Sequence, residues 1–172
     1  GSTYVSTQET SVAQLVELGA PIVYLADTPG VANPDLVRRT VEDLRARWPQ
    51  ARIGLHLHDT RGLGGANVYA ALQMGVELFD SSVSGLGGCP YAPGATGNVA
   101  TEDVLYMLDG LGIETGVDMS KLLEAGEYIC GFLNRPTVSR AGRALLAKRK
   151  REAKAAAERE RIAKEITRLE GE

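Results

Sequence analysis

The only two histidines of the chain, His56 and His58, lie two residues apart in the segment RIGLHLHD. Alternate residues of a β-strand point to the same face, so both imidazoles are expected on one face, with Leu55 and Leu57 on the other. Two adjacent imidazoles at the end of a strand can bind a divalent metal ion. The alternative is that two polar residues line this side of a sheet without a metal.

The nearby candidates for further metal ligands are mostly oxygens, namely Asn98, Asp27, Asp59 and Asp80, which follow predicted strands or end a glycine-rich loop. A mixed set of nitrogen and oxygen ligands favours Mg²⁺ or Mn²⁺. Zn²⁺ prefers further nitrogen or sulfur ligands, and Cys89 is the candidate that would support it.

Cys89 lies between Gly88 and Pro90 in the segment SGLGGCPYAPGATGN, residues 84–98. So many glycines and prolines predict an exposed loop that can close over a site, rather than a packed element. A thiol in such a loop is better suited to act as a moving acid than as a structural ligand or a buried hydrophobic residue.

Three short hydrophobic runs, residues 21–27, 51–59 and 76–83, are predicted to form strands. Helices are predicted to begin at Asn33-Pro34-Asp35, near Gly65, at Thr101 and at Ser120, with Leu36, Val37, Val41 and Leu44 as the hydrophobic face of the first. Residues 3–7 and 12–18 are expected to form a further strand and a short helix. Alternating strands and helices predict a parallel α/β sheet, whose functional residues collect at the carboxyl ends of the strands.

From about Ala147 the sequence becomes rich in alanine and charged residues, and Glu160 and Lys164 have the spacing of a helical ion pair. We expect a domain over residues 1–146 and a charged helical tail over 147–172. A solvated helix is the simplest interpretation of the tail, and Ile162, Ile166 and Leu169 leave open a helix that binds a partner. The interleaved glutamates argue against RNA or lipid binding by residues 148–151.

The composition is that of an ordinary soluble protein: 172 residues, 44% hydrophobic, 24% charged, with a net charge of −3. Neither a nucleic-acid partner nor a membrane partner is expected, because the chain is not basic overall and has no hydrophobic run of about 18 residues. Its two cysteines, Cys89 and Cys130, do not suggest a disulfide framework and predict a reducing compartment.

Residues 81–118, SSVSGLGGCPYAPGATGNVATEDVLYMLDGLGIETGVD, resemble the signature region of the 3-hydroxy-3-methylglutaryl-CoA lyase family. The resemblance continues through LADTPGVANP, through HLHDTRGLGGANVYAALQMGVELFDSSV and through KLLEAGEYICGFLNRPTVSR, to about Arg140. Related synthases carry an acidic GERxGN-type loop where this chain has its cysteine loop, so the resemblance is to the lyases.

This resemblance implies the C-terminal part of a (β/α)8 barrel, about strands five to eight. It also implies metal-dependent cleavage of the acyl-CoA substrate 3-hydroxy-3-methylglutaryl-CoA into acetyl-CoA and acetoacetate, in the cytoplasm or the mitochondrial matrix. The residues that match family roles are His56, His58 and Asn98 for Mg²⁺ or Mn²⁺, Cys89 and His56 for proton transfer, and Asp27, Thr28 and Gly88 for substrate binding.

The resemblance also implies that half of the site is missing, because the family's first strand carries an Arg-Asp pair that has no counterpart here. Either a complementing N-terminal half or a homodimer is therefore expected to complete the site. A non-catalytic protein derived from the barrel, and a lyase for longer 3-hydroxy-3-alkylglutaryl thioesters, are the alternatives.

Overall fold

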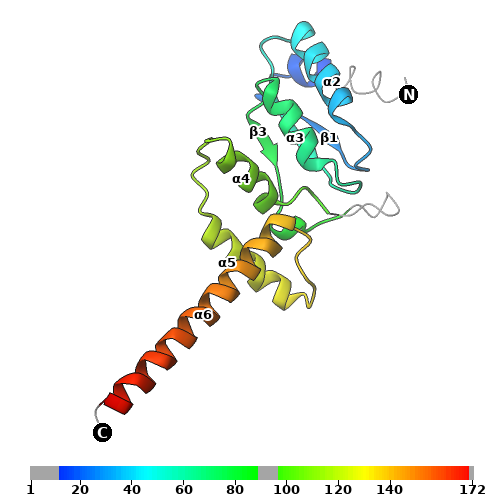
Figure 1. Ribbon diagram of the computed structural model, residues 1–172. Helices are drawn as coiled ribbons and strands as arrows, with labels where there is room; N and C mark the ends of the chain where they lie inside the picture. The colour runs from blue at the N-terminus through cyan, green and yellow to red at the C-terminus, as the bar shows by residue number, and fades with distance from the viewer. Residues whose placement is uncertain (1–11, 89–96, 171–172) are drawn as a thin grey trace.

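The computed structural model describes residues 12–88 and 97–170, and its centre is a parallel three-stranded sheet in the order β1-β2-β3 (Figure 1). The strands are β1 (Ile22–Asp27), β2 (Arg52–Leu57) and β3 (Leu78–Asp80). Ile22 is paired with Arg52, and Gly54 with Leu78, so the three strands end at the same edge of the sheet. The predicted parallel α/β arrangement is confirmed, while the strand expected at residues 3–7 lies outside the described residues.

β3 is shorter than the predicted strand at 76–83. After Asp80 the chain leaves the sheet and forms a 3-10 turn, η1 (Val83–Gly85). Ser82 pairs with Ala100 instead of extending the ladder with β2, and its N–H donates to Val99 at 3.1 Å. The end of β3 is thereby joined to the segment that follows the glycine-rich loop.

Helices α2 (Pro34–Arg47) and α3 (Gly64–Gln73) pack against each other and cover one face of the sheet (Figure 1). The side chain of Asn33 accepts the Leu36 N–H at 2.9 Å and caps the start of α2, as expected of Asn before a helix. The buried hydrophobic side chains shared by these two helices and the sheet are Val23, Val37, Val41, Leu44, Ile53, Leu55, Leu57, Val68 and Ala71. Leu36, predicted to share the hydrophobic face of α2, is instead 38% exposed.

The opposite face of the sheet carries Tyr24, Gly54 and His56. The Tyr24 ring lies over Gly54 so closely that a Cβ at Gly54 would come within 2.6 Å of a ring carbon. Tyr24 nevertheless remains 44% exposed, since no helix of the described residues covers this face. The sheet therefore has one fully packed face and one open face.

Helices α4 (Thr101–Gly110), α5 (Met119–Phe132) and the first turns of α6 (Arg140–Glu170) form a second packed group. Asp118 caps α5, its carboxylate accepting the Ser120 and Lys121 N–H groups at 2.7 and 3.1 Å. The hydrogen bonds from Lys121 and Ser120 hold the pKa of Asp118 below its ordinary value of 3.8. The helix thus begins one residue before the Ser120 start that the sequence predicts.

α6 is one continuous helix that begins at Arg140, before the predicted start of the tail, and extends away from the other elements (Figure 1). Its first turn is attached to α4 because the Asp103 carboxylate accepts the Ser139 hydroxyl at 2.8 Å and the Ala141 N–H at 2.7 Å. The predicted Glu160–Lys164 ion pair is present. None of the helices in the described ranges is long and hydrophobic enough to cross a membrane.

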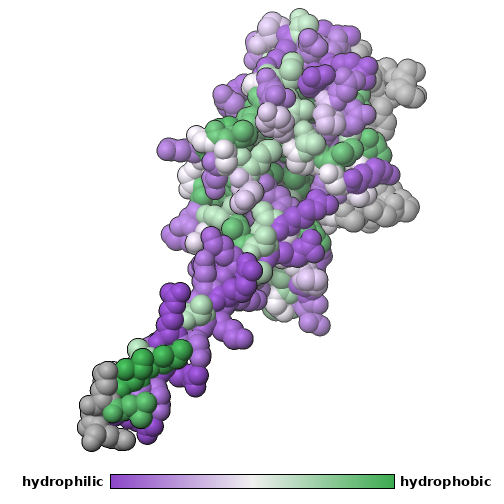
Figure 2. Space-filling view, viewed as in Figure 1, coloured by the Kyte–Doolittle hydropathy of each residue, from purple (hydrophilic) through white to green (hydrophobic). Residues whose placement is uncertain are grey.

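Hydrophobic side chains reappear near the far end of α6 (Figure 2). Ile162, Ile166 and Leu169 are between 47% and 60% exposed there. α6 remains helical beyond the turns that contact the rest of the chain. Its many alanines favour a helix, and ion pairs within the helix, such as Glu158–Arg161 and Glu165–Arg168, stabilise it further.

Candidate active site

The imidazoles of His56 and His58 lie side by side at the carboxyl end of β2. Their ring centroids are 5.3 Å apart and the ring planes meet at 62°. His58 is 4% exposed, whereas the side chain of His56 is 33% exposed toward the open face. The strand alternation thus places both rings together, with Leu55 and Leu57 buried against the helices on the other face.

Asn98 is brought opposite His58, although the two residues are far apart in the sequence. The pair forms an antiparallel bridge, flanked by the Val99 N–H donating to Leu57 at 3.0 Å and the Asp59 N–H donating to Gly97 at 3.3 Å. The end of the glycine-rich loop therefore extends the β2 edge beyond the strand.

Of the two polar atoms of the Asn98 amide, only the nitrogen has a hydrogen-bond partner among the described residues. Its Nδ2 donates to the Leu86 carbonyl at 3.0 Å, which fixes the orientation of the amide. Its Oδ1 is buried and has no hydrogen-bond partner among the described residues. A buried acceptor without a donor is costly, so an amide oxygen in this state suits a bound cation.

Asp80, one of the sequence candidates for an oxygen ligand, instead contacts the ring of His56. Nδ1 of His56 and Oδ2 of Asp80 are 3.3 Å apart, across the β2–β3 pairing. With the proton on Nδ1, this contact orients the ring and leaves the Nε2 lone pair for a ligand, as carboxylates beside metal-binding histidines commonly do. Within residues 12–88 and 97–170, no group of three or more His, Cys, Asp or Glu side chains is placed to hold a metal ion. A metal site formed by His56 and His58 would therefore depend on Asn98 as its third ligand.

Asp27 ends β1 and shapes the loop that follows it. Its two carboxylate oxygens accept the Val31 and Ala32 N–H groups at 3.0 and 2.9 Å. These bonds close the turn that contains Thr28, and both Asp27 and Thr28 are only partly exposed. The predicted contact of these two residues with a substrate stays a prediction.

Arg61 joins the same turn to the end of β2, and sequence reasoning did not single it out. One guanidinium nitrogen donates to the carbonyls of Pro29 and Gly30, at 2.9 and 3.0 Å. Gly30 has φ = 61°, and a Cβ there would lie 2.7 Å from the Thr60 hydroxyl, so the two loops are in close contact. An arginine after a strand gives no sequence signal for this contact.

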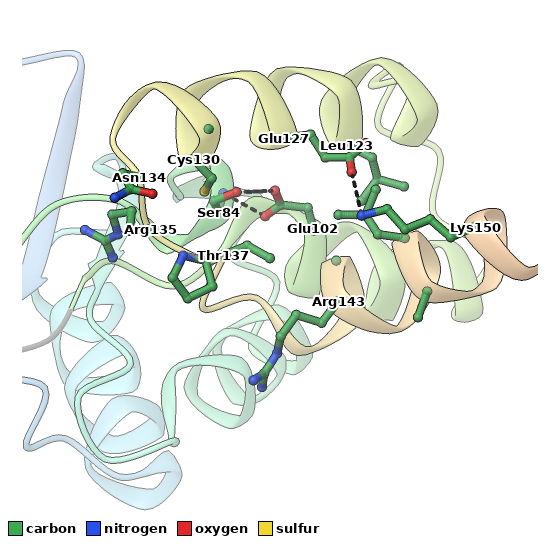
Figure 3. Close-up of a pocket in the computed structure, with 16 residues that line it drawn as sticks. Ser84, Glu102, Leu123, Glu127, Cys130, Asn134, Arg135, Thr137, Arg143 and Lys150 are labelled. Atoms are coloured by element: carbon green, nitrogen blue, oxygen red, sulfur yellow. Dashed lines mark hydrogen bonds and ion pairs between the residues drawn. The ribbon is translucent and has the colours of Figure 1, made fainter.

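The first stem of the cysteine loop has an unusual backbone that a buried carboxylate holds in place. Ser84 has φ = 56°, a left-handed conformation that is uncommon for residues other than glycine. Both carboxylate oxygens of Glu102 accept the Ser84 N–H, at 2.9 and 3.0 Å (Figure 3). Each of the two residues is 1% exposed, and the sequence indicated Glu102 only as part of a helix start.

The two stems of the cysteine loop are in direct contact beside the histidines. A Cβ at Gly97 would overlap the carbonyl of Gly85, and one at Gly87 would lie 2.6 Å from Nδ2 of Asn98. Gly88 is exposed at the end of the first stem. Cys89 itself lies outside the described residues, so its predicted role is not tested by the structure.

A sequence model of the HMGL-like family matches residues 5–129. The 3-hydroxy-3-isohexenylglutaryl-CoA/hydroxymethylglutaryl-CoA lyase of Pseudomonas aeruginosa is 53% identical over 135 residues, which are 78% of this chain and 45% of that protein. A mitochondrial hydroxymethylglutaryl-CoA lyase of Pongo abelii is 51% identical over 76% of this chain and 40% of its own length. A cytoplasmic 3-hydroxy-3-methylglutaryl-CoA lyase of Danio rerio is 51% identical over 80% of this chain and 42% of its own length.

Solved structures show the same similarity. The crystal structure of the hydroxymethylglutaryl-CoA lyase from Pseudomonas aeruginosa superposes with a TM-score of 0.77 at 53% identity, over 82% of this chain and 47% of that one. An HMG-CoA lyase from Acinetobacter baumannii, in complex with coenzyme A and 3-methylmalate, gives a TM-score of 0.73 at 40% identity, over 78% of this chain and 44% of that one. The chain thus spans a little under half the length of the relatives it matches.

Proposed function

The chain belongs to the HMGL-like family, and we propose that it supplies half of the active site of a lyase that cleaves 3-hydroxy-3-methylglutaryl-CoA into acetyl-CoA and acetoacetate. The observation that carries this proposal is the convergence of His56, His58 and Asn98 at one sheet edge, with Oδ1 of Asn98 buried and unpartnered. His56 and His58 lie at the carboxyl end of the parallel strand β2, where barrel enzymes place their catalytic groups, and Asn98 is bridged to His58 there.

His56, His58 and Asn98 are the residues that would hold a divalent ion, Mg²⁺ or Mn²⁺. Their two imidazoles and one amide oxygen make a mixed set of nitrogen and oxygen ligands, which favours such an ion. When bound, a divalent ion of this kind polarises the hydroxyl and carbonyl oxygens of the substrate.

The proton transfers are assigned to His56 and Cys89. Cleavage requires that the proton of the tertiary hydroxyl be removed as the carbon–carbon bond breaks, which leaves the electron pair on the carbon next to the thioester. His56 is the candidate base for the hydroxyl proton because Asp80 orients its ring at 3.3 Å and leaves Nε2 free; Nε2 can serve as this base only while it does not bind the metal ion. Cys89 would then donate its thiol proton to the thioester carbanion; the two stems of its loop are in contact with each other, and the second stem is bridged to His58.

Asp27, Thr28 and Gly88 are proposed to contact the acyl-CoA. Asp27 holds the loop after β1 in place, and Arg61 ties that loop to β2. A loop that is held in place next to the histidines does not have to rearrange when a substrate binds. It can therefore hold the substrate in a fixed orientation.

We propose that a second half-barrel completes the site. Within the described ranges, β1 and β3 each have one edge without a strand partner. On the open face of the sheet, the side chain of Tyr24 is 44% exposed. Unpaired edges and an open face are what a further set of strands would cover in a closed barrel. We propose that a complementing N-terminal half, or a second copy of this chain, covers them.

A longer acyl chain is the second candidate substrate, because the Pseudomonas aeruginosa relative is named for 3-hydroxy-3-isohexenylglutaryl-CoA as well. Comparing turnover of the two thioesters distinguishes these candidates. Relatives named for the mitochondrion and for the cytoplasm leave these two compartments as the proposed locations.

Release of acetyl-CoA from 3-hydroxy-3-methylglutaryl-CoA by the chain, with Mg²⁺ or Mn²⁺, tests the proposal. If copies of the chain complete the site, we expect metal-dependent turnover that Cys89→Ala lowers by at least about 100-fold, the range typical of a lost general acid. Turnover that Cys89→Ala leaves unchanged contradicts the assigned acid. Absence of turnover points to the complementing half rather than a second copy.

A further inference from the structure

A cavity of about 450 Å³ adjoins the candidate active site on the side of α6. It is bounded by the loop at residues 59–62, by Gly97, Asn98 and Ala100, by Asp103 of α4, and by Val138, Arg140 and Arg143 at the start of α6. Asn98 lines this cavity and also faces His58, so the cavity and the histidine pair share a wall.

Positive charge predominates in this cavity, because its two carboxylates already have partners. Asp103 accepts hydrogen bonds from Ser139 and Ala141 at 2.8 and 2.7 Å, both at the start of α6. Asp59 accepts the Gly64 N–H at 2.7 Å and lies 3.4 Å from a guanidinium nitrogen of Arg140.

The positive charges of Arg61 and Arg143 are not paired with a carboxylate of the described residues. Arg61 donates to two backbone carbonyls, which leaves its charge unneutralised. Arg143 has no carboxylate within ion-pair distance in the part of the chain that the structure describes. Arg143 also lines a second cavity, between α5 and α6, and Figure 3 shows its guanidinium group extending away from Glu102 and Lys150 of that cavity.

Thr60 also lines this cavity, and its hydroxyl group lies close to Gly30. Its hydroxyl oxygen is buried and has no hydrogen-bond partner among the described residues. A buried hydroxyl without a partner costs free energy, which a ligand that accepts its proton would recover. Guanidinium groups and a hydroxyl together are the donors that bind carboxylate and phosphate oxygens.

We propose that this arginine cavity, defined by Thr60, Arg61, Arg140 and Arg143, binds an oxyanion of the acyl-CoA substrate. The inference rests on the proposed function, since it takes the ligand to be an acyl-CoA. Two sources of the oxyanion fit a cavity that borders Asn98: the phosphate groups of coenzyme A and the free carboxylate of the glutaryl group.

Calorimetric titration of the full chain with three probes, coenzyme A, 3-hydroxy-3-methylglutarate and pyrophosphate, tests this proposal. Arg143→Gln is expected to weaken binding of the cognate probe about ten-fold or more, as the loss of a charge-assisted hydrogen bond does, and Arg143→Lys is expected to restore part of it. Arg151→Gln, an exposed arginine farther along α6, is the matched control and is expected to leave binding unchanged.

Weakening confined to coenzyme A and pyrophosphate assigns the cavity to phosphate, and weakening confined to 3-hydroxy-3-methylglutarate assigns it to carboxylate. If the chain binds pyrophosphate through Arg143 but neither of the other probes, the cavity binds an oxyanion and the proposed function fails. Equal binding by the unaltered chain and Arg143→Gln, or no binding of any probe, overturns the inference.

Discussion

Replacing His56 by alanine is expected to weaken Mn²⁺ binding by about 100-fold or more, because one of the three proposed protein ligands is removed. His56 is the better first choice of the two histidines, since its side chain is 33% exposed and its loss leaves the core intact. Titration of Mn²⁺ followed by its electron paramagnetic resonance signal measures the affinity directly.

His58→Ala and Asn98→Ala are expected to have effects of the same order if the three residues act on one ion. Asp35→Asn, at an exposed carboxylate on α2 that pairs only with neighbouring arginines, controls for nonspecific binding to surface acids. Mn²⁺ binding that is equally strong in the unaltered chain and in His56→Ala refutes the assignment of the site.

Replacing Glu102 by alanine is expected to lower the free energy of unfolding by about 3 kcal/mol. The change leaves the buried N–H of Ser84 without an acceptor and removes the group that holds Ser84 in its left-handed conformation. The buried donor left unsatisfied destabilises the folded chain, and relaxation of the strained Ser84 backbone offsets part of that cost. Urea denaturation followed by circular dichroism measures the change.

Glu102→Gln separates the contribution of the charge from that of the hydrogen-bond acceptor, because it keeps the shape and one acceptor oxygen but not the charge. We expect Glu102→Gln to lower the free energy of unfolding by about 1–2 kcal/mol, which is less than the decrease expected for the alanine variant. Glu124→Ala, at a carboxylate with a side chain 67% exposed, is the matched surface control, with an expected effect within about 0.5 kcal/mol. A cost for Glu102→Ala as small as that of the control argues against the role given to this carboxylate.

The parallel sheet and its helices were predictable because local patterns determine them. Runs such as PIVYLAD and RIGLHL mark strands, and Asn33 before Pro34 marks a helix start. The limits of β3 and of α6 were not predictable from the same patterns. β3 stops where Ser82 pairs with Ala100, and α6 begins where Asp103 caps it, and both contacts join distant segments.

In the candidate site, too, some residues were predictable from local sequence patterns and others were not. Two histidines on one strand face follow from the period of a β-strand, so their proximity could be predicted from spacing alone. Asn98 was a candidate because it ends the glycine-rich loop, and only the fold shows it opposite His58. Arg61 and Glu102 act through contacts with Gly30 and Ser84, which leave no trace in the local sequence.

The central claim, that this chain carries a functional half of a lyase active site, is tested most directly by a chimera. Residues 1–140 of this chain would replace the matching segment of the Pseudomonas aeruginosa lyase, and acetyl-CoA release from 3-hydroxy-3-methylglutaryl-CoA would be measured with Mg²⁺ and Mn²⁺. We predict metal-dependent turnover that His58→Ala abolishes in the chimera. A folded chimera that binds the metal ion and releases no acetyl-CoA would contradict the claim.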